Sequence, residues 1–209
     1  MVKIDLVTGF LGSGKTTFLK KYAKRLMEQG QNIGILENDF GAVNVDMLLL
    51  QELEGEQCEL EMISGGCDPE THRRRFRTKL IAMGMCGYDR VLVEPSGIYD
   101  MDEFFDVLHE EPLDQWYEIG NVIAVVDARL EDTLSPEAEY LLASQAANAG
   151  CMILSKCDTA TEEQRQNTIA HLKRSLAALG CKQRADQKIL CEGAEPLTDQ
   201  EFAAILSCG

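Results

Sequence analysis

The stretch that decides the fold lies near the start of the chain and reads Gly9-Phe10-Leu11-Gly12-Ser13-Gly14-Lys15-Thr16. It fits the pattern G-x-x-x-x-G-K-[ST] in full. An apolar run, Val2–Thr8, ends just before it, and an amphipathic helical pattern, Lys15–Gln29, begins within it. Glycines let successive backbone N–H groups point at phosphate oxygens, and a helix N-terminus adds partial positive charge. The stretch therefore predicts a phosphate-binding loop between a strand and a helix.

The residue types in this loop predict separate roles. Lys15 is expected to reach the β and γ phosphates of a nucleotide, and the Thr16 hydroxyl is expected to ligate Mg2+. The rest of the loop is expected to hold phosphates: Gly9, Gly12, Ser13, Gly14 and Thr17. A chance match in a glycine-rich turn is the alternative, and the flanking strand and helix patterns argue against it.

Strand-like and helical patterns alternate along the whole chain. Strands are predicted at Val2–Thr8, Asn32–Glu37, Arg90–Glu94, Val122–Asp127, Cys151–Lys156 and Lys188–Cys191, and a β-hairpin at Leu50–Ile63. Helices are predicted at Lys15–Gln29, Pro69–Met83 with Asp68 as N-cap, Met101–Leu108, Pro136–Asn148, Thr161–Leu179 and Thr198–Leu206. This alternation predicts βαβ units. The expected fold is one α/β domain over residues 1–209, a three-layer α/β/α P-loop nucleotide-binding fold with a mainly parallel central sheet.

Composition narrows the class of partner. The 209 residues carry a net charge of −15, which repels a nucleic-acid backbone or an anionic membrane. No apolar run approaches the ~20 residues that span a bilayer, and we expect no signal peptide. The eight cysteines form no CxxC pair. We therefore expect a cytoplasmic protein with reduced thiols that binds neither nucleic acid nor membrane.

A second motif follows an apolar strand and reads Val91-Leu92-Val93-Glu94-Pro95-Ser96-Gly97. A carboxylate at the carboxyl end of a core strand lies at the crevice where α/β folds bind ligands. Glu94 is thus expected to hold Mg2+ or its water shell, and the N–H of Gly97 to approach the γ-phosphate. An ordinary strand-to-loop turn is the alternative.

A third motif, Ser155-Lys156-Cys157-Asp158, follows the predicted strand at Met152–Leu154. It is similar to the [N/S]KxD motif by which GTPases read guanine. The Asp158 carboxylate can accept hydrogen bonds from N1–H and the exocyclic amine of guanine, a pair that adenine does not offer, and the stem of Lys156 can pack along the base. Ser155 replaces the commoner Asn, which predicts weaker support of the loop. The motif favours GTP over ATP.

Together these residues resemble the CobW/HypB/UreG class of GTPases, and CobW-like proteins most closely. The resemblance rests on Thr8–Thr17, Glu37-Asn38-Asp39-Phe40-Gly41, Glu94-Pro95-Ser96-Gly97, Val125-Val126-Asp127-Ala128 and Ser155-Lys156-Cys157-Asp158. It implies GTP hydrolysis coupled to delivery of a metal such as zinc, cobalt or nickel to a client metalloprotein, a switch loop at Glu37–Asp46, and a homodimer. Within that loop Glu37 or Asp39 is expected to order the attacking water or to help hold the metal.

The chain departs from the family pattern at the metal motif. CobW-like proteins carry a CxCC motif, and the matching stretch here reads Ser64-Gly65-Gly66-Cys67-Asp68-Pro69-Glu70. We also expect no counterpart of the carboxy-terminal CobW domain. A reduced transition-metal site, for Zn2+ or a similar ion, is predicted at Cys67, Glu37 and His72. The alternative is that Cys67 packs, Asp68 caps a helix and His72 is solvated.

Three functions stay open from the sequence. The first is a Mg2+-dependent GTPase that acts as a switch or metallochaperone-like accessory protein, with Lys15, Glu37, Asp39 and Glu94 in catalytic roles. The second is a P-loop kinase or ATP-dependent ligase for a small molecule, with the arginines of the Arg73–Arg77 cluster on a lid. The third is a catalytically weak nucleotide-dependent scaffold. The arginine cluster itself is read either as a partner contact or as an exposed helical face.

Overall fold

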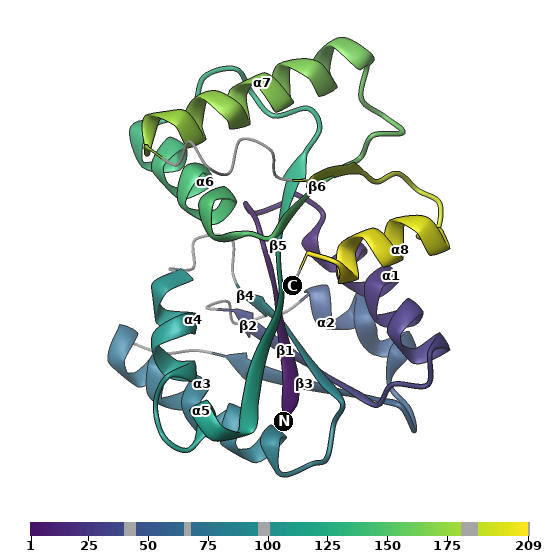
Figure 1. Ribbon diagram of the computed structural model, residues 1–209, viewed down its shortest axis with the longest axis vertical. Coiled ribbons are helices and arrows are strands. Elements are labelled where there is room, and N and C mark those ends of the chain that lie inside the picture. Colours follow the sequence, from purple (N-terminus) through teal and green to yellow (C-terminus); the bar gives the residue numbers. More distant parts are fainter. Residues whose placement is uncertain (40–44, 65–67, 96–100, 181–187, 209) are drawn as a thin grey trace.

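The computed structural model describes residues 1–39, 45–64, 68–95, 101–180 and 188–208. Seven strands in these ranges form one parallel sheet in the order β3-β2-β4-β1-β5-β6-β7 (Figure 1). They are β1 Val2–Thr8, β2 Ile33–Asp39, β3 Cys58–Ser64, β4 Arg90–Pro95, β5 Tyr117–Asp127, β6 Cys151–Ser155 and β7 Lys188–Cys191. The predicted parallel α/β architecture is confirmed.

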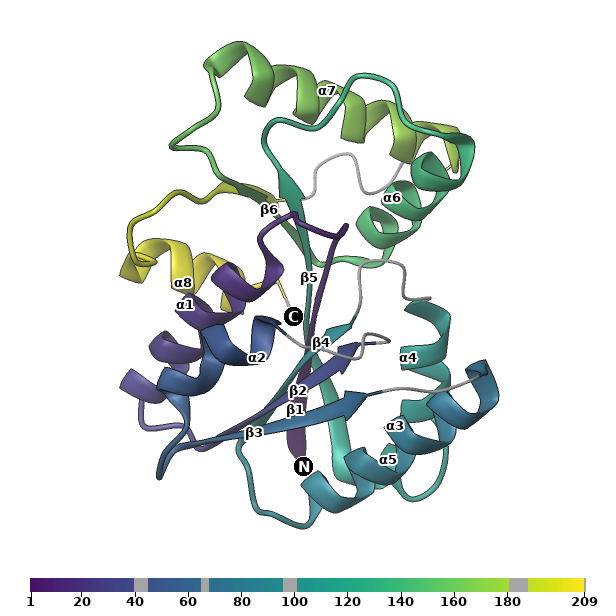
Figure 2. The same ribbon diagram turned by 180° about the vertical axis from the view of Figure 1, so that it is seen from behind.

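Helices cover both faces of the sheet, as Figures 1 and 2 show from opposite sides. The helices are α1 Lys15–Glu28, α2 Val45–Leu50, α3 Pro69–Gly84, α4 Met101–Leu108, α5 Leu113–Trp116, α6 Pro136–Asn148, α7 Glu162–Ala178 and α8 Asp199–Leu206, with a short 3-10 turn at Gln51–Leu53. One apolar core joins the sheet to α3, α4, α6 and α7, and a second joins it to α1 and α8. This arrangement gives the three layers.

Local capping explains where several helices begin. The Asp68 carboxylate accepts the Thr71 N–H at 2.9 Å and caps α3, as predicted. Thr161 and Thr198 each form a capping box at the start of α7 and α8. Such caps satisfy N–H groups that the first helical turn leaves without a partner. No helix within the described ranges has the length and apolarity that crossing a bilayer requires.

A buried polar network fastens the amino-terminal end of the sheet. Asp5 is fully buried and accepts hydrogen bonds from Arg90 Nη1 at 2.6 and 2.7 Å, from Tyr22 Oη at 2.7 Å and from the Asn121 N–H at 2.7 Å. These partners come from β4, α1 and β5. A buried carboxylate tolerates its desolvation only with such partners. The network therefore ties α1 to three adjacent strands.

The predicted hairpin at Leu50–Ile63 is wrong. Cys58–Ser64 is instead the edge strand β3, which pairs in parallel with β2 from Ile33↔Cys58 to Asp39↔Ser64. The turn residues Glu54–Gly55–Glu56 lead only to an isolated antiparallel bridge, Gly55↔Cys58. Residues 50–53 complete α2 and the 3-10 turn, so that apolar positions there contact α1 rather than a second strand.

Candidate nucleotide site

The predicted motifs meet at the carboxyl ends of the central strands. The phosphate loop joins β1 to the N-terminus of α1, Glu94 lies near the end of β4, and the Ser155–Asp158 motif follows β6. Because β1, β4, β5 and β6 are parallel neighbours, their carboxyl ends open onto one edge of the sheet. This edge is where parallel α/β folds bind ligands.

The loop has the backbone conformation that only glycine adopts readily. Gly14 has φ +93° and is the N-cap of α1, and Gly9 has φ +146°. A Cβ at Gly9 would lie 2.2 Å from the carbonyl oxygen of Val125, so β5 leaves no room for a side chain. The loop is closed on itself by the Ser13 N–H, which donates to Phe10 O at 3.1 Å. The N–H groups at the N-terminus of α1 can therefore bind a phosphate group.

Oxygen-bearing side chains gather where the sequence predicted Mg2+. The Thr16 hydroxyl donates to Glu94 Oε1 at 2.8 Å. Glu37 on β2 stands directly across from Glu94 in the strand register, and these side chains are only 2% and 3% exposed. Two buried carboxylates side by side favour a cation, and oxygen ligands of this kind suit Mg2+. Lys15 Nζ lies 3.2 Å from Phe10 O, folded over the loop.

A cleft of about 310 Å³ adjoins the loop on the side of β6. Its lining includes Gly14 and Thr17 of the loop and helix α1, Lys156 and Asp158 of the predicted base motif, and Gly193 after β7. Asp158 is exposed at this cleft. The cleft therefore places a carboxylate and a phosphate loop on one continuous surface, as a nucleotide requires.

Lys156 connects the base motif to the phosphate loop. Its Nζ donates to Gly12 O at 2.6 Å and to Asp127 Oδ2 at 2.7 Å. It also has φ +57°, the left-handed conformation that non-glycine residues seldom adopt. Left-handed backbone at a non-glycine residue whose ammonium makes one ion pair and one hydrogen bond to a carbonyl is typical of a functional position.

Ser155 contacts the phosphate loop directly. Its hydroxyl is buried and donates to Ser13 O at 2.5 Å, with Val126 O at 3.2 Å. A Cβ at Gly14 would lie 3.5 Å from the Ser155 hydroxyl, so the strand end and the loop are in contact. The serine thus makes a loop-to-motif contact of its own.

Asp127 at the end of β5 is a site residue whose role the sequence reasoning missed. It holds Lys156 and also accepts from the Arg129 N–H at 2.8 Å and from Arg129 Nε at 3.2 Å. Burial alone would raise its pKa, but the hydrogen bonds from Arg129 and Lys156 outweigh burial and lower the pKa to about 2. The signal in the sequence was an acidic residue that ends an apolar strand, as at Glu94.

The predicted transition-metal residues are only partly placed. Gly97 and Cys67 lie outside the described residues, and Asp39 is described only as the last residue of β2. His72 is fully buried, with Nδ1 3.4 Å from Glu103 Oε1 on α4, so the alternative of a solvated imidazole is wrong. Across the described part of the chain, no three His, Cys, Asp or Glu side chains form a metal-ligand group.

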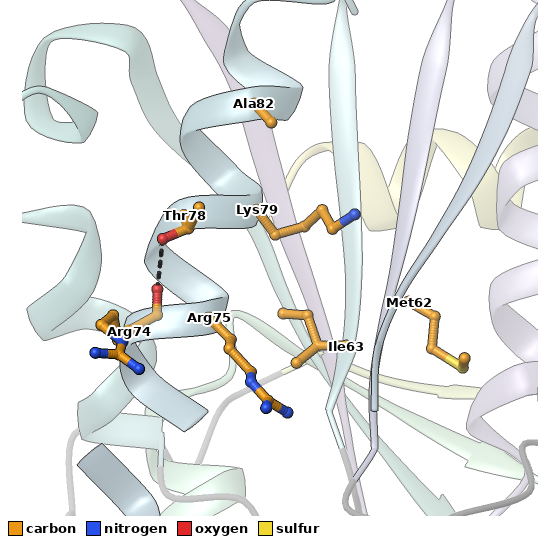
Figure 3. Close-up of a pocket in the computed structure, with 7 residues that line it drawn as sticks. All are labelled: Met62, Ile63, Arg74, Arg75, Thr78, Lys79 and Ala82. Atoms are coloured by element: carbon orange, nitrogen blue, oxygen red, sulfur yellow. Dashed lines mark hydrogen bonds between the residues drawn. The ribbon is translucent and has the colours of Figure 1, made fainter. Parts of the chain in front are cut away.

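The arginine cluster of α3 divides into two faces. Arg73 and Arg77 both pair with Glu110 beyond α4, at 2.7 and 2.9 Å. Arg74 and Arg75 instead line a hollow of about 480 Å³ between α3 and the edge strand β3, together with Met62, Ile63, Thr78, Lys79 and Ala82 (Figure 3). Two strands separate β3 from β1 and its phosphate loop. The hollow is therefore distinct from the nucleotide cleft.

Comparison with known proteins agrees with this geometry. The sequence profile of the CobW/HypB/UreG nucleotide-binding domain matches residues 3–182. The chain belongs to this family. The match extends from β1 through α7, so it includes the phosphate loop, Glu94 and the Ser155–Asp158 motif.

Relatives within the CobW/HypB/UreG family include zinc chaperones. Zinc chaperone YjiA of Escherichia coli K12 is 30% identical over 78% of this chain and 52% of its own length. Zinc chaperone YeiR of the same organism is 28% identical over 79% of this chain and 50% of its own length. A crystal structure of a Zn(II)-bound triple mutant of the YjiA GTPase superposes with a TM-score of 0.57 at 20% identity, covering 98% of this chain and 60% of that one. The chain thus spans about half the length of the curated relatives it matches.

Proposed function

We propose that this chain is a Mg2+-dependent GTPase that serves as a metallochaperone-like switch. The observation that carries the proposal is the pair of contacts made by Lys156, which fastens a guanine-type motif to the phosphate loop. Membership in a nucleotide-binding family whose relatives are named zinc chaperones supports the same conclusion. GTP or GDP is then the nucleotide, and a client metalloprotein is the partner.

The residues of the loop perform hydrolysis by position and charge. Backbone N–H groups of the loop and the Lys15 ammonium stabilise the charge on the transferring oxygens while water attacks the γ-phosphorus in line. Thr16 and Glu94, with Glu37 beside them, would hold Mg2+, which when bound neutralises phosphate oxygens. Glu37 or Asp39 orders the attacking water, and Gly97 meets the γ-phosphate. Turnover is slow until a partner, such as a second copy of the chain, completes the site.

Guanine selectivity comes from Asp158. A carboxylate accepts both N1–H and the exocyclic amine of guanine, whereas adenine presents an acceptor at N1. Asp158 lies at the cleft and is exposed, so the base can reach it. Asp127 holds the ammonium of Lys156, and the aliphatic stem of Lys156 packs along the base.

The metal cargo is the second part of the proposal. Cys67, Glu37 and His72 are proposed to take part in handling Zn2+ or a similar ion during the nucleotide cycle. His72 is buried against α4, so its part in such a site requires α4 to move with the nucleotide state. Equilibrium dialysis with Zn2+ tests this directly, and equal uptake by wild type and C67A would reject Cys67 as a ligand.

Phosphate release tests the proposal as a whole. We expect purified wild type to release phosphate from GTP with Mg2+, to prefer GTP to ATP, and to lose this activity in K15A. Parallel reactions with Zn2+ show whether the cargo changes the rate. A preference for ATP, or transfer of phosphate to an acceptor other than water, would reject a GTPase in favour of a kinase or ligase.

A further inference from the structure

Two thiols meet directly beneath the guanine-type motif. Cys157 lies between Lys156 and Asp158, and Cys191 is the last residue of β7. Strand register places Cys191 opposite Leu154, and the Cys157 N–H donates to the Glu192 carbonyl at 3.0 Å. The Cys157 thiol donates to Leu154 O at 3.0 Å, on the residue that Cys191 opposes, so the two thiols lie on neighbouring backbone positions. Residues 34 positions apart in sequence are thus neighbours at the base cleft.

We propose that Cys157 and Cys191 form a reversible disulfide, introduced by low-molecular-weight disulfides, that weakens the binding of guanine nucleotides. The effect on nucleotide rests on the proposed function, whereas the disulfide itself does not. It needs only the two neighbouring thiols and access for the oxidant.

Access favours Cys191 as the point of entry. Cys191 is exposed, while Cys157 is half-buried and burial raises the pKa of its thiol to about 11. The Cys191 thiolate attacks one sulfur of a disulfide RSSR, forms a mixed disulfide and expels RS−. The Cys157 thiol, once deprotonated, attacks the Cys191 sulfur and expels the second RS−. Two protein thiols are oxidised and one RSSR is reduced to two RSH.

Closing this bond must displace the motif. A disulfide holds its sulfurs at about 2.05 Å, closer than two thiols approach without a bond. Cys157 also gives up its present contact, in which its thiol donates to Leu154 O at 3.0 Å. The adjacent Asp158 packs beside the backbone of Gly193, since a Cβ built at Gly193 would lie 3.4 Å from the Asp158 Cβ. Movement of Cys157 toward β7 therefore shifts the carboxylate that reads the base.

The chain supplies a matched comparison. Cys151 and Cys208 are also neighbours, since a Cβ at Gly150 would lie 3.6 Å from the Cys208 Cβ, but Cys151 is fully buried and burial raises the pKa of its thiol far above the ordinary value. A thiol without access and without thiolate reacts slowly with disulfides. The same oxidant should thus distinguish the pair with the exposed Cys191 from the pair with the fully buried Cys151.

The test uses the full chain as wild type, C191A and C208A. Each protein is incubated with oxidised glutathione, mapped by peptide mass spectrometry, and titrated with GDP in a calorimeter before oxidation, after it, and after dithiothreitol. We expect a linked Cys157–Cys191 peptide in wild type and C208A, with a rise in the GDP Kd of about tenfold, the effect of one lost charge-assisted hydrogen bond. Dithiothreitol should restore the Kd, and C191A should show neither change.

Three results would overturn the proposal. These are the absence of the linked peptide, glutathione left on Cys191 without closure, and a linked peptide with an unchanged GDP Kd. If the reduced wild type does not bind GDP at all, the proposed function fails and the effect on nucleotide fails with it. The linked peptide would then still establish the disulfide, so the two failures are distinguishable.

Discussion

Replacing Asp158 by Asn should invert the choice of base. The wild-type carboxylate accepts two donors of guanine, N1–H and the exocyclic amine. In D158N the amide presents one acceptor and one donor group, so its NH2 faces the guanine amine and repels it. Xanthine carries a carbonyl oxygen in place of that amine and accepts the amide N–H. The variant should therefore prefer xanthosine diphosphate.

The exposure of Asp158 limits the size of the effect. A hydrogen bond to a charged group contributes about 1.5–3 kcal/mol, and solvent reduces this at an exposed position. One such bond is lost in D158N and the bond to N1–H becomes a neutral one, so at the lower end we expect about 2 kcal/mol, which is roughly a thirtyfold rise in the GDP Kd. Calorimetric titration of wild type and D158N with GDP and xanthosine diphosphate measures both preferences. Unfolding in urea should change by less than about 0.5 kcal/mol, since the side chain is exposed.

An inverted preference is a result that damage to the fold would not produce. If D158N binds GDP within threefold of wild type, Asp158 does not read the base. If D158N loses GDP and gains nothing for xanthosine diphosphate, Asp158 acts on the shape of the loop rather than through hydrogen bonds to the base.

Further predictions concern the metal, the core and pH. E94Q should lower the Mg2+-dependent release of phosphate from GTP by roughly a hundredfold with GDP affinity in EDTA unchanged, and an unaltered rate would exclude Glu94 as a ligand. D5A leaves Arg90 buried without its carboxylate and should reduce the free energy of unfolding in urea by about 3–5 kcal/mol, against about 0.2–1 kcal/mol for R165A at an exposed pair. Similar losses in the two variants would contradict the network. Because the pKa of Asp127 is lowered to about 2, its contribution to stability is complete above its unfolded pKa of about 3.9 and is lost as pH falls toward 2. D127N should therefore flatten this part of a plot of Tm against pH.

Local patterns made most of the fold predictable. The phosphate loop, the cap at Asp68 and the strand at Arg90–Glu94 each depend on residues close together in sequence, and the structure places them as expected. The hairpin failed because a turn signal at Gly55 says nothing of the partner of the following strand. The pairing of β3 with β2 depends on burial of both faces of a parallel sheet, and a short stretch of sequence does not show this burial.

Long-range contacts in the site were less predictable. Motif spacing predicted roles for Lys156 and Asp158. The contact from Lys156 to Asp127 joins two strand ends whose proximity follows from the sheet order. The alternative to a metal role for His72 was a solvated imidazole. His72 is buried because α4, a separate element, covers that face of α3.

The central claim is that one surface holds both the phosphates and the guanine base of a nucleotide. Calorimetric titration of the wild-type chain with GDP and with ADP, both in Mg2+, tests it most directly. The geometry predicts that GDP binds at least about a hundredfold more tightly than ADP, because only guanine offers two donors to Asp158. Equal affinities, or tighter binding of ADP, would contradict the claim.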